Sequence, residues 1–308
     1  RPQAFEVNNS CIRRLLELRV MVHFGLTMFA TDYSVPIDIL AGTAEKLGFE
    51  SLFVPEHTHI PASRLSPWPG GADLPRDYWH TLDPFVSLAL AASATKSLKI
   101  GTGISLITER DPILMAKQVA TLDFVSGGRL ILGVGAGWNQ EEMENHGVAF
   151  STRWRILRER ILAMREIWTQ DEAEYHGEFV DFDKIWAFPK PIQAGGPKIL
   201  IGASSEYVFQ RIADYGDGWM PIFQDAKRRS ASGGTDYSQG IENTKAAWRS
   251  AEREGEPDFS IFGVAHERKA VEELISIGFN RIIFGLPSAN ADTVLPMVEK
   301  LATIAHEF

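Results

Sequence analysis

The chain has 308 residues, of which 44% are hydrophobic and 23% charged, and its formal net charge is −9. This is the composition of an ordinary globular protein, and without a dense stripe of Lys and Arg it is a poor partner for nucleic acid or an anionic membrane surface. The single cysteine, Cys11, excludes an intrachain disulfide and a cysteine-based metal cluster, and it fits a reducing cytoplasm. No apolar run of about 18 residues is present, so no membrane-spanning helix is expected.

The amino-terminal segment differs from the rest of the sequence. It lacks the long apolar stretch of a signal peptide, and Met21 directly precedes the first strand-like segment. We therefore expect residues 1–20 to be an extension outside the core fold, and residues 21–308 to form a single domain.

From residue 22 onward, strand-like and helix-like segments alternate. Asp83-Pro84 and Asp111-Pro112 predict two helix starts, because Asp caps a helix and Pro fits its first turn. In the first half, strands are expected over 22–28, 51–54, 98–106 and 129–135, and helices over 36–47, 83–96 and 111–125. A long loop over 57–81, rich in Pro and aromatic residues, follows the second strand.

The second half is more widely spaced. Segment 174–188 alternates in polarity and predicts a β-hairpin or lid, and segment 225–236 is polar and rich in Gly and Ser, which predicts a mobile loop. Strands are expected over 198–201, 218–222, 259–264 and 281–286, and helices over 139–145, 152–169, 204–215, 237–254, 266–277 and 291–306.

Strands that alternate with helices indicate parallel βαβ units. Eight such units in a chain of this length predict an α/β fold, a (β/α)8 TIM barrel with insertions, with a doubly wound open sheet as the alternative. In a barrel, the chemistry lies at the carboxyl ends of the strands. Those ends therefore hold the candidate site residues.

The expected fourth strand ends in alternating glycines, Gly133, Gly135 and Gly137, followed by Trp138 and a helix. Glycine lets the backbone approach a ligand closely, and the first N–H groups of a helix point at it. The alternative is a tight turn without a ligand. A dinucleotide-binding fold fits poorly, because the motif does not end the first strand and no strand with an acidic end follows.

Gly202, Ala203, Ser204 and Ser205 join the fifth strand to a helix. Small residues and hydroxyls at such a junction suit a phosphate group. The alternative is that Ser204 or Ser205 simply caps the helix.

Glu56 and His57 follow the second strand. His57 is a candidate general acid/base, because imidazole titrates near neutrality, and Glu56 is a candidate to set its tautomer or contact a ligand. The alternatives are a loop histidine that is hydrogen-bonded to the structure and a carboxylate that is solvated or ion-paired. A metal site with His59 is disfavoured, because no third ligand motif follows.

Several sequence blocks together resemble the luciferase-like monooxygenase superfamily of flavin and deazaflavin enzymes, and within it the coenzyme F420-dependent oxidoreductases of actinobacteria. The blocks span 45–52, 110–112, 116–123, 126–129, 133–138, 168–169, 189–193, 201–204 and 216–219. The resemblance covers about residues 22–222. It implies the barrel fold and a cofactor ring that lies across the strand ends.

The resemblance also implies roles for single residues. Gly103 and Ile104, beside Ser105, match the place where many deazaflavin members have a non-prolyl cis peptide behind the ring. Gly135, Ala136 and Gly137 match the cofactor loop after the fourth strand, Gly202 to Ser205 match the phosphate-side loop, and His57 matches an active-site histidine. One departure is Trp138, because sugar-phosphate dehydrogenases of the family carry a carboxylate there.

The expected function is hydride transfer between coenzyme F420 and a small organic substrate. The alternatives are an FMN-dependent monooxygenase supplied by a partner reductase, and a non-catalytic barrel that binds a flavin or another ligand. Loop 57–81 and segments 174–188 and 225–236 are expected to enclose the substrate. Their aromatic residues favour an apolar substrate or wall, with ordinary loop packing as the alternative. Relatives imply a homodimer or a larger homo-oligomer.

Overall fold

The computed structural model describes residues 22–71, 73–224 and 236–308. The expected extension at residues 1–20 lies outside these ranges, as does nearly all of the expected mobile loop 225–236. Within the described ranges, no helix is long and apolar enough to cross a membrane.

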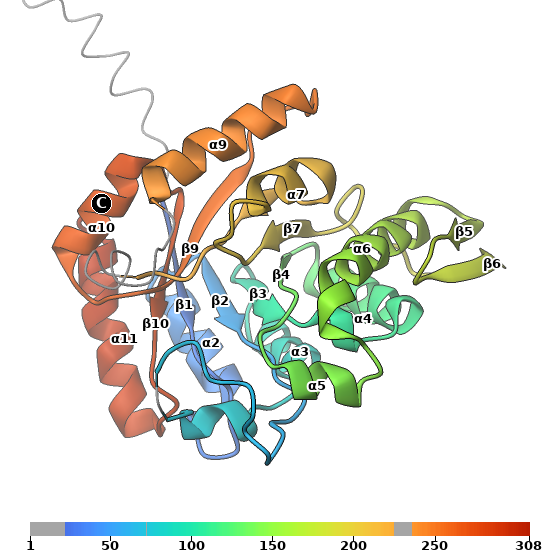
Figure 1. Ribbon diagram of the computed structural model, residues 1–308. Coiled ribbons are helices and arrows are strands. Elements are labelled where there is room, and N and C mark those ends of the chain that lie inside the picture. The colour runs from blue at the N-terminus through green and yellow to red at the C-terminus, as the bar shows by residue number, and fades with distance from the viewer. Residues whose placement is uncertain (1–21, 72, 225–235) are drawn as a thin grey trace, which may run out of the picture.

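Eight parallel strands close into a barrel in the order β1-β10-β9-β8-β7-β4-β3-β2, which confirms the predicted architecture (Figure 1). The strands are β1 (His23–Thr27), β2 (Ser51–Val54), β3 (Lys99–Ser105), β4 (Leu130–Val134), β7 (Lys198–Ile201), β8 (Gly218–Trp219), β9 (Asp258–Val264) and β10 (Arg281–Gly285). Parallel strands with helical crossovers are buried on both faces, which explains their nearly continuous apolar sequences.

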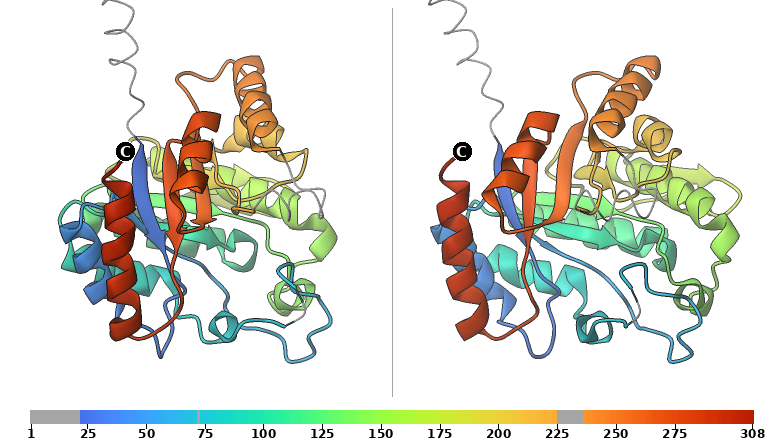
Figure 2. Two further views of the ribbon diagram at one scale, coloured as in Figure 1. Left: turned by 90° about the vertical axis from the view of Figure 1, so that its left-hand side faces the viewer. Right: turned by 60° about the vertical axis from the view of Figure 1, so that its left-hand side comes forward.

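Helices surround the barrel on its outer side, and Figure 2 shows the carboxyl-terminal helix α11 running along it. They are α2 (Ile37–Lys46), α3 (Pro84–Ala94), α4 (Pro112–Ser126), α5 (Gln140–Asn145), α6 (Arg153–Thr169), α7 (Val208–Tyr215), α9 (Tyr237–Ser250), α10 (Arg268–Ile277) and α11 (Ala291–Ala305). The short 3-10 helices are η1 (Arg76–Trp79), η2 (Ile107–Glu109) and η3 (Phe150–Thr152). Asp83 and Asp111 accept hydrogen bonds from the first turns of α3 and α4, as their sequence pattern predicts.

Side chains rather than open space fill the barrel. Phe53, Ile131, Leu200, Met220 and Ile283 form this inner cluster, and half-buried Ile104 and Phe262 pack against it near the carboxyl ends of β3 and β9. The upper surface of this cluster is therefore an apolar floor under the mouth of the barrel.

Two of the predicted elements that are shorter than expected lie at the carboxyl end of the barrel. The helix expected over 204–215 begins only at Val208, because residues 202–207 form a loop closed by the bond from Val208 N to the Ser205 carbonyl, 3.0 Å. The strand expected over 218–222 ends at Trp219, and pairing with β9 resumes at Ile222. Pro221 lies between them and has no N–H to donate.

The hairpin expected within 174–188 is present as β5 (Ala173–His176) and β6 (Asp181–Ile185). It extends outward beyond α6, on the flank of the barrel, so the expectation that it encloses a substrate at the mouth is not met in this structure (Figure 1). The amides of Glu178, Phe179 and Val180, which lie in its turn, bond to the carboxylate of Glu159 on α6.

Candidate active site

His57 lies directly after β2 and is held by Glu142 of α5. The distance from His57 Nδ1 to Glu142 Oε2 is 2.7 Å, and Thr58 N donates to Oε1 of the same carboxylate at 3.1 Å. The side chains of His57 and Glu142 are only 7% and 1% exposed. Because a carboxylate only accepts hydrogen bonds, Nδ1 carries the proton and Nε2 is left to act as a base or, when protonated, as an acid.

Glu56 points elsewhere, which corrects the hypothesis that it sets the tautomer of His57. Its carboxylate accepts from Ser105 Oγ at 2.6 Å, Leu106 N at 2.8 Å and Arg110 Nε at 2.6 Å. Arg110 also bonds to Asp83 at 2.8 Å. Glu56 and Ser105 thus tie the end of β2 to the end of β3, with both side chains buried behind the site.

The peptide bond between Gly103 and Ile104 is cis, at the position that the family resemblance implies. The pairing of β3 with β4 changes register between Thr102 and Ser105. The Ile104 side chain lies against two glycines, Gly135 directly after β4 and Gly202 directly after β7. A Cβ atom on Gly135 would overlap Ile104 Cδ1, and one on Gly202 would lie 2.7 Å from Ile104 Cγ2. These two glycines therefore make room for Ile104, and the loops that hold them meet at the apolar floor.

The loop after β4 continues toward His57. Ala136 is buried, and Gly137 has a φ of 78°, a left-handed conformation that favours glycine. Trp138 then lies edge-on to His57, with 5.8 Å between the ring centroids. The structure thus brings the predicted residues His57, Ile104, Gly135, Trp138 and Gly202 to one end of the barrel.

Ser204 and Ser205 do not cap a helix, because α7 begins at Val208 with Tyr207 at its cap position. Both serines are exposed on the loop after β7. Arg211 of α7 donates to Ser205 Oγ at 3.5 Å. Sequence reasoning did not single out this arginine, although its position one helical turn after the loop was a usable signal.

Arg153 begins α6 and lies within electrostatic reach of Arg211. Burial first, and then Arg211, lowers the pKa of Arg153, and its buried Nε has no hydrogen-bond partner in the part of the chain that the structure describes. The 3-10 helix η3 leads directly into α6, and Arg153 donates from Nη1 to the Phe150 carbonyl at 2.8 Å. The two arginines and the Gly202–Ser205 loop form a donor set that suits a phosphate.

Glu109 is a further buried carboxyl near His57 that sequence reasoning missed. Its side chain is 1% exposed, and among the described residues its Oε2 has no hydrogen-bond partner and forms an ion pair with His146 Nε2 at 3.8 Å. Burial, together with Glu142 and Glu56, raises its pKa to about 9. Within the described ranges, no group of three or more His, Cys, Asp or Glu side chains is arranged to hold a metal ion.

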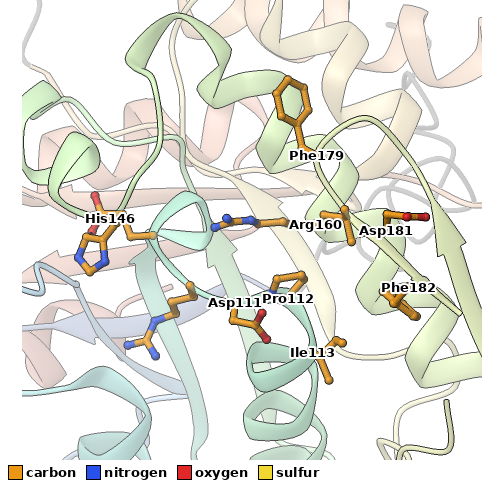
Figure 3. A pocket seen from close by; sticks show the side chains of 11 residues that line it. Asp111, Pro112, Ile113, His146, Arg160, Phe179, Asp181 and Phe182 are labelled. Atoms are coloured by element: carbon orange, nitrogen blue, oxygen red, sulfur yellow. The ribbon is translucent and has the colours of Figure 1, made fainter.

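Glu109 lines a cavity of about 380 Å³ on the flank of the barrel, between the start of α4, α6 and the β5–β6 hairpin. Figure 3 shows Arg160 and His146 among its lining side chains. The cavity is separate from the apolar floor at the mouth, and its charges are mixed, with Asp111 and Asp181 beside Arg110 and Arg160.

Comparison with known proteins agrees with the fold. The profile of the family described as luciferase-like monooxygenase matches residues 37–294. An uncharacterized protein of Mycobacterium tuberculosis (strain ATCC 25618 / H37Rv) is 39% identical over 284 residues, which cover 91% of this chain and 98% of that protein. An FMNH2-dependent dimethylsulfone monooxygenase of Pseudomonas putida is 40% identical over 123 residues, or 39% of this chain and 33% of that protein.

One similar solved structure is an F420-dependent secondary alcohol dehydrogenase in complex with an F420-acetone adduct. Its TM-score is 0.73 over 92% of this chain and 98% of its own, at 18% sequence identity. At this identity the likeness establishes a shared fold.

Proposed function

Because the chain belongs to the luciferase-like monooxygenase family, whose members are F420- or FMN-dependent oxidoreductases and monooxygenases, we propose that it transfers hydride between coenzyme F420 and a small organic substrate. The observation that carries this proposal is the His57–Glu142 pair at the carboxyl end of β2. Hydride exchange with an alcohol or a carbonyl needs a group that takes up or supplies a proton, and a histidine fixed by a carboxylate is such a group.

The residues present fit a cofactor of this kind. Half-buried Ile104 and Phe262 offer an apolar surface for a ring, and the loops of Gly135 and Gly202 border it. Arg153, Arg211 and Ser205 supply the donors for its phosphate. When bound, a deazaflavin ring accepts or releases a hydride.

The chain's own residues would then orient the substrate and move the proton. His57 Nε2 accepts the hydroxyl proton as an alcohol is oxidised, and donates it to the oxygen in the reverse direction. Glu142 keeps Nδ1 protonated and stabilises the imidazolium that forms. The roles of Gly103, Ser105, Ala136 and Gly137 are to shape the backbone behind the site.

Cofactor titration tests the proposal. The full chain is mixed with F420 or FMN, and binding is followed by the fluorescence of the ring. We expect F420 to bind and its oxidised form to be reduced in the presence of a substrate alcohol. Tight binding of FMN without binding of F420 would exclude the proposal, and binding of either cofactor without turnover across a broad panel of alcohols, enones and imines would favour a non-catalytic binding protein.

The phosphate donors are tested by Arg211→Gln. Removing one of two guanidinium groups should weaken cofactor binding by about tenfold at low salt, and by less at high salt, because exposed charges are screened. Arg249→Gln, at the far end of α9, is the matched control and should bind the cofactor as the wild type does. Equal affinities for Arg211→Gln and wild type would remove Arg211 from the phosphate site.

The second candidate function is an FMN-dependent monooxygenase supplied with reduced flavin by a partner reductase. The observation that favours it is the 40% identity to the dimethylsulfone monooxygenase over 123 residues. The same titration separates the two, because a deazaflavin does not readily activate oxygen. Substrate oxygenation that depends on FMN and an added reductase would support this candidate.

We also infer a homodimer formed through α3 and α4. Both helices expose large apolar side chains on the side away from the barrel, including Val86 and Leu90 of α3 and Leu114, Phe124 and Val125 of α4. Exposed apolar side chains on two neighbouring helices suit an association face. Sedimentation of the full chain should show a dimer that the double variant Val86→Glu/Leu90→Glu dissociates, and a wild-type monomer would refute the inference.

A further inference from the structure

Four aromatic side chains form a connected cluster beside His57, which we call the aromatic wall: Phe29, Trp68, Tyr78 and Trp138. Tyr78 is at its centre, with ring centroids 5.1 Å from His57, 4.7 Å from Phe29 and 5.7 Å from Trp68. Trp138 closes the wall 6.5 Å from Tyr78. All four side chains are half-buried, so each keeps part of its ring exposed.

These rings come from separate parts of the chain that meet at the carboxyl ends of the strands. Phe29 follows β1, Trp138 follows β4, and Tyr78 lies on η1 within the long loop after β2. The loop is anchored because Thr81 pairs with Thr31 and Leu82 N donates to the Ala30 carbonyl at 2.8 Å. The position of the aromatic wall at the mouth of the barrel is therefore fixed by backbone contacts of the loop.

The charged groups of the same loop differ in how close they come to the wall: half-buried Asp77 lies close enough to Tyr78 to help burial raise the pKa of its hydroxyl, whereas His80 and Arg76 contact residues outside the wall. His80 bonds to Asp32 at 2.9 Å, and the Arg76 guanidinium lies 4.6 Å from the centre of the Tyr33 ring. Burial raises the pKa of Tyr78, so its hydroxyl stays neutral. The charged side chain in direct contact with His57 is Glu142, which would repel an anionic group placed beside the histidine.

We propose that the substrate is an uncharged molecule with a flat apolar ring, which lies against the aromatic wall and directs a carbonyl or hydroxyl oxygen to His57. The part of this proposal that concerns the reacting oxygen rests on the proposed function, and the part that concerns the ring rests on the aromatic wall. Aromatic rings packed edge to face present a broad apolar surface that favours another ring. An apolar ring pays no charge desolvation on entering such a site, whereas a carboxylate or ammonium group does.

Binding to the full chain without cofactor tests the substrate class apart from the reaction. Three probes share one ring and one carbonyl: acetophenone, 4-acetylbenzoate and 4-acetyl-N,N,N-trimethylanilinium. Dissociation constants are measured by ligand-observed NMR. We expect acetophenone to bind at least about tenfold more tightly than either charged probe. Equal or tighter binding of a charged probe would overturn the proposal.

Two variants place the binding on the wall. Trp138→Ala should weaken acetophenone binding by about tenfold, and Trp138→Phe should restore most of it, because the ring is what binds. Trp79→Ala is the matched control, since Trp79 lies on the same loop but is 51% exposed and its ring contact is with His80. Equal effects of Trp138→Ala and Trp79→Ala would overturn the proposal.

The outcomes also separate this proposal from the proposed function. Probe binding on the wall without any turnover would leave the substrate class standing and reject the hydride-transfer function. Turnover restricted to charged alcohols or ketones would support the hydride-transfer function and reject the proposed substrate class.

Discussion

Glu142 lies 85 residues after His57 in the sequence, yet its Oε2 is 2.7 Å from His57 Nδ1. The two side chains come from different barrel units, His57 from the end of β2 and Glu142 from the helix after β4. The cap of α5 fixes the position of Glu142, because Asn139 Oδ1 accepts from Glu142 N at 3.2 Å. The pair is therefore set by the backbone as well as by its own hydrogen bond.

Glu142→Gln should lower kcat by about 10²-fold or more while leaving the cofactor dissociation constant nearly unchanged. The amide keeps the shape of the side chain but loses the charge that stabilises a protonated His57. Steady-state kinetics and cofactor titration measure the two quantities. Glu144→Gln, on the exposed side of the same helix, is the control and should behave as the wild type does. A parallel loss of cofactor affinity would mean that Glu142 supports the cofactor instead.

Glu56→Gln should act on stability rather than on proton transfer. It breaks a buried ion pair with Arg110, whose side chain is 14% exposed. Removing one member of such a pair typically costs about 3–5 kcal/mol, and the remaining bond to Asp83 places the expected cost near the lower end, at about 3 kcal/mol. Urea unfolding measures it. A variant that is as stable as the wild type but inactive would return Glu56 to a catalytic role.

The barrel could be predicted from the sequence because local patterns carry it. Apolar strands, Asp-Pro helix starts such as Asp83-Pro84, and glycine at the end of a helix are all short-range signals. The late start of α7 could not be read this way, since Ser204 and Ser205 look like a cap until the loop around them is known. Pro221 indicated that β8 ends early, because proline cannot donate to a sheet, but the apolar sequence around it favoured a longer strand.

The site was predicted less completely, because its partners depend on long-range contacts. His57 was found from its place after a strand, but the adjacent Glu56 was a more obvious partner than Glu142. Arg153 and Arg211 became visible only when the turn after β7 was placed beside the start of α6. Adjacent residues in the sequence predict a catalytic pair reliably only when the two side chains lie on the same helix or strand.

Gly135→Ala should destabilise the fold by about 1–3 kcal/mol, because the added methyl group overlaps the Ile104 side chain. Adding Ile104→Val removes the Cδ1 atom that it meets, so the double variant should recover most of the lost free energy of unfolding. Denaturant unfolding of both variants measures this. If Gly135 served only the approach of a ligand, the single variant would unfold as the wild type does and only its cofactor affinity would fall.

Glu109→Gln should stabilise the protein at neutral and alkaline pH. In the folded chain the pKa of Glu109 is raised from its usual 4.5 to about 9 by burial and by Glu142 and Glu56. Below pH 4.5 the carboxyl is protonated in both the folded and the unfolded chain, so it does not change the free energy of unfolding. As the pH rises, only the unfolded chain releases the proton, and this lowers the free energy of unfolding until the folded-state pKa is passed.

Glutamine is neutral at every pH, so the free energy of unfolding of Glu109→Gln does not fall in this way as the pH rises. Its advantage over the wild type should be close to zero near pH 4.5 and grow by about 1.4 kcal/mol for each pH unit above that, to roughly 4–5 kcal/mol at pH 8. Urea unfolding across this range measures the difference, with exposed Glu144→Gln as the control that should follow the wild-type slope. The same pH slope for Glu109→Gln and wild type would show that Glu109 ionises normally in the fold, and the uncharged state assigned to it would be wrong.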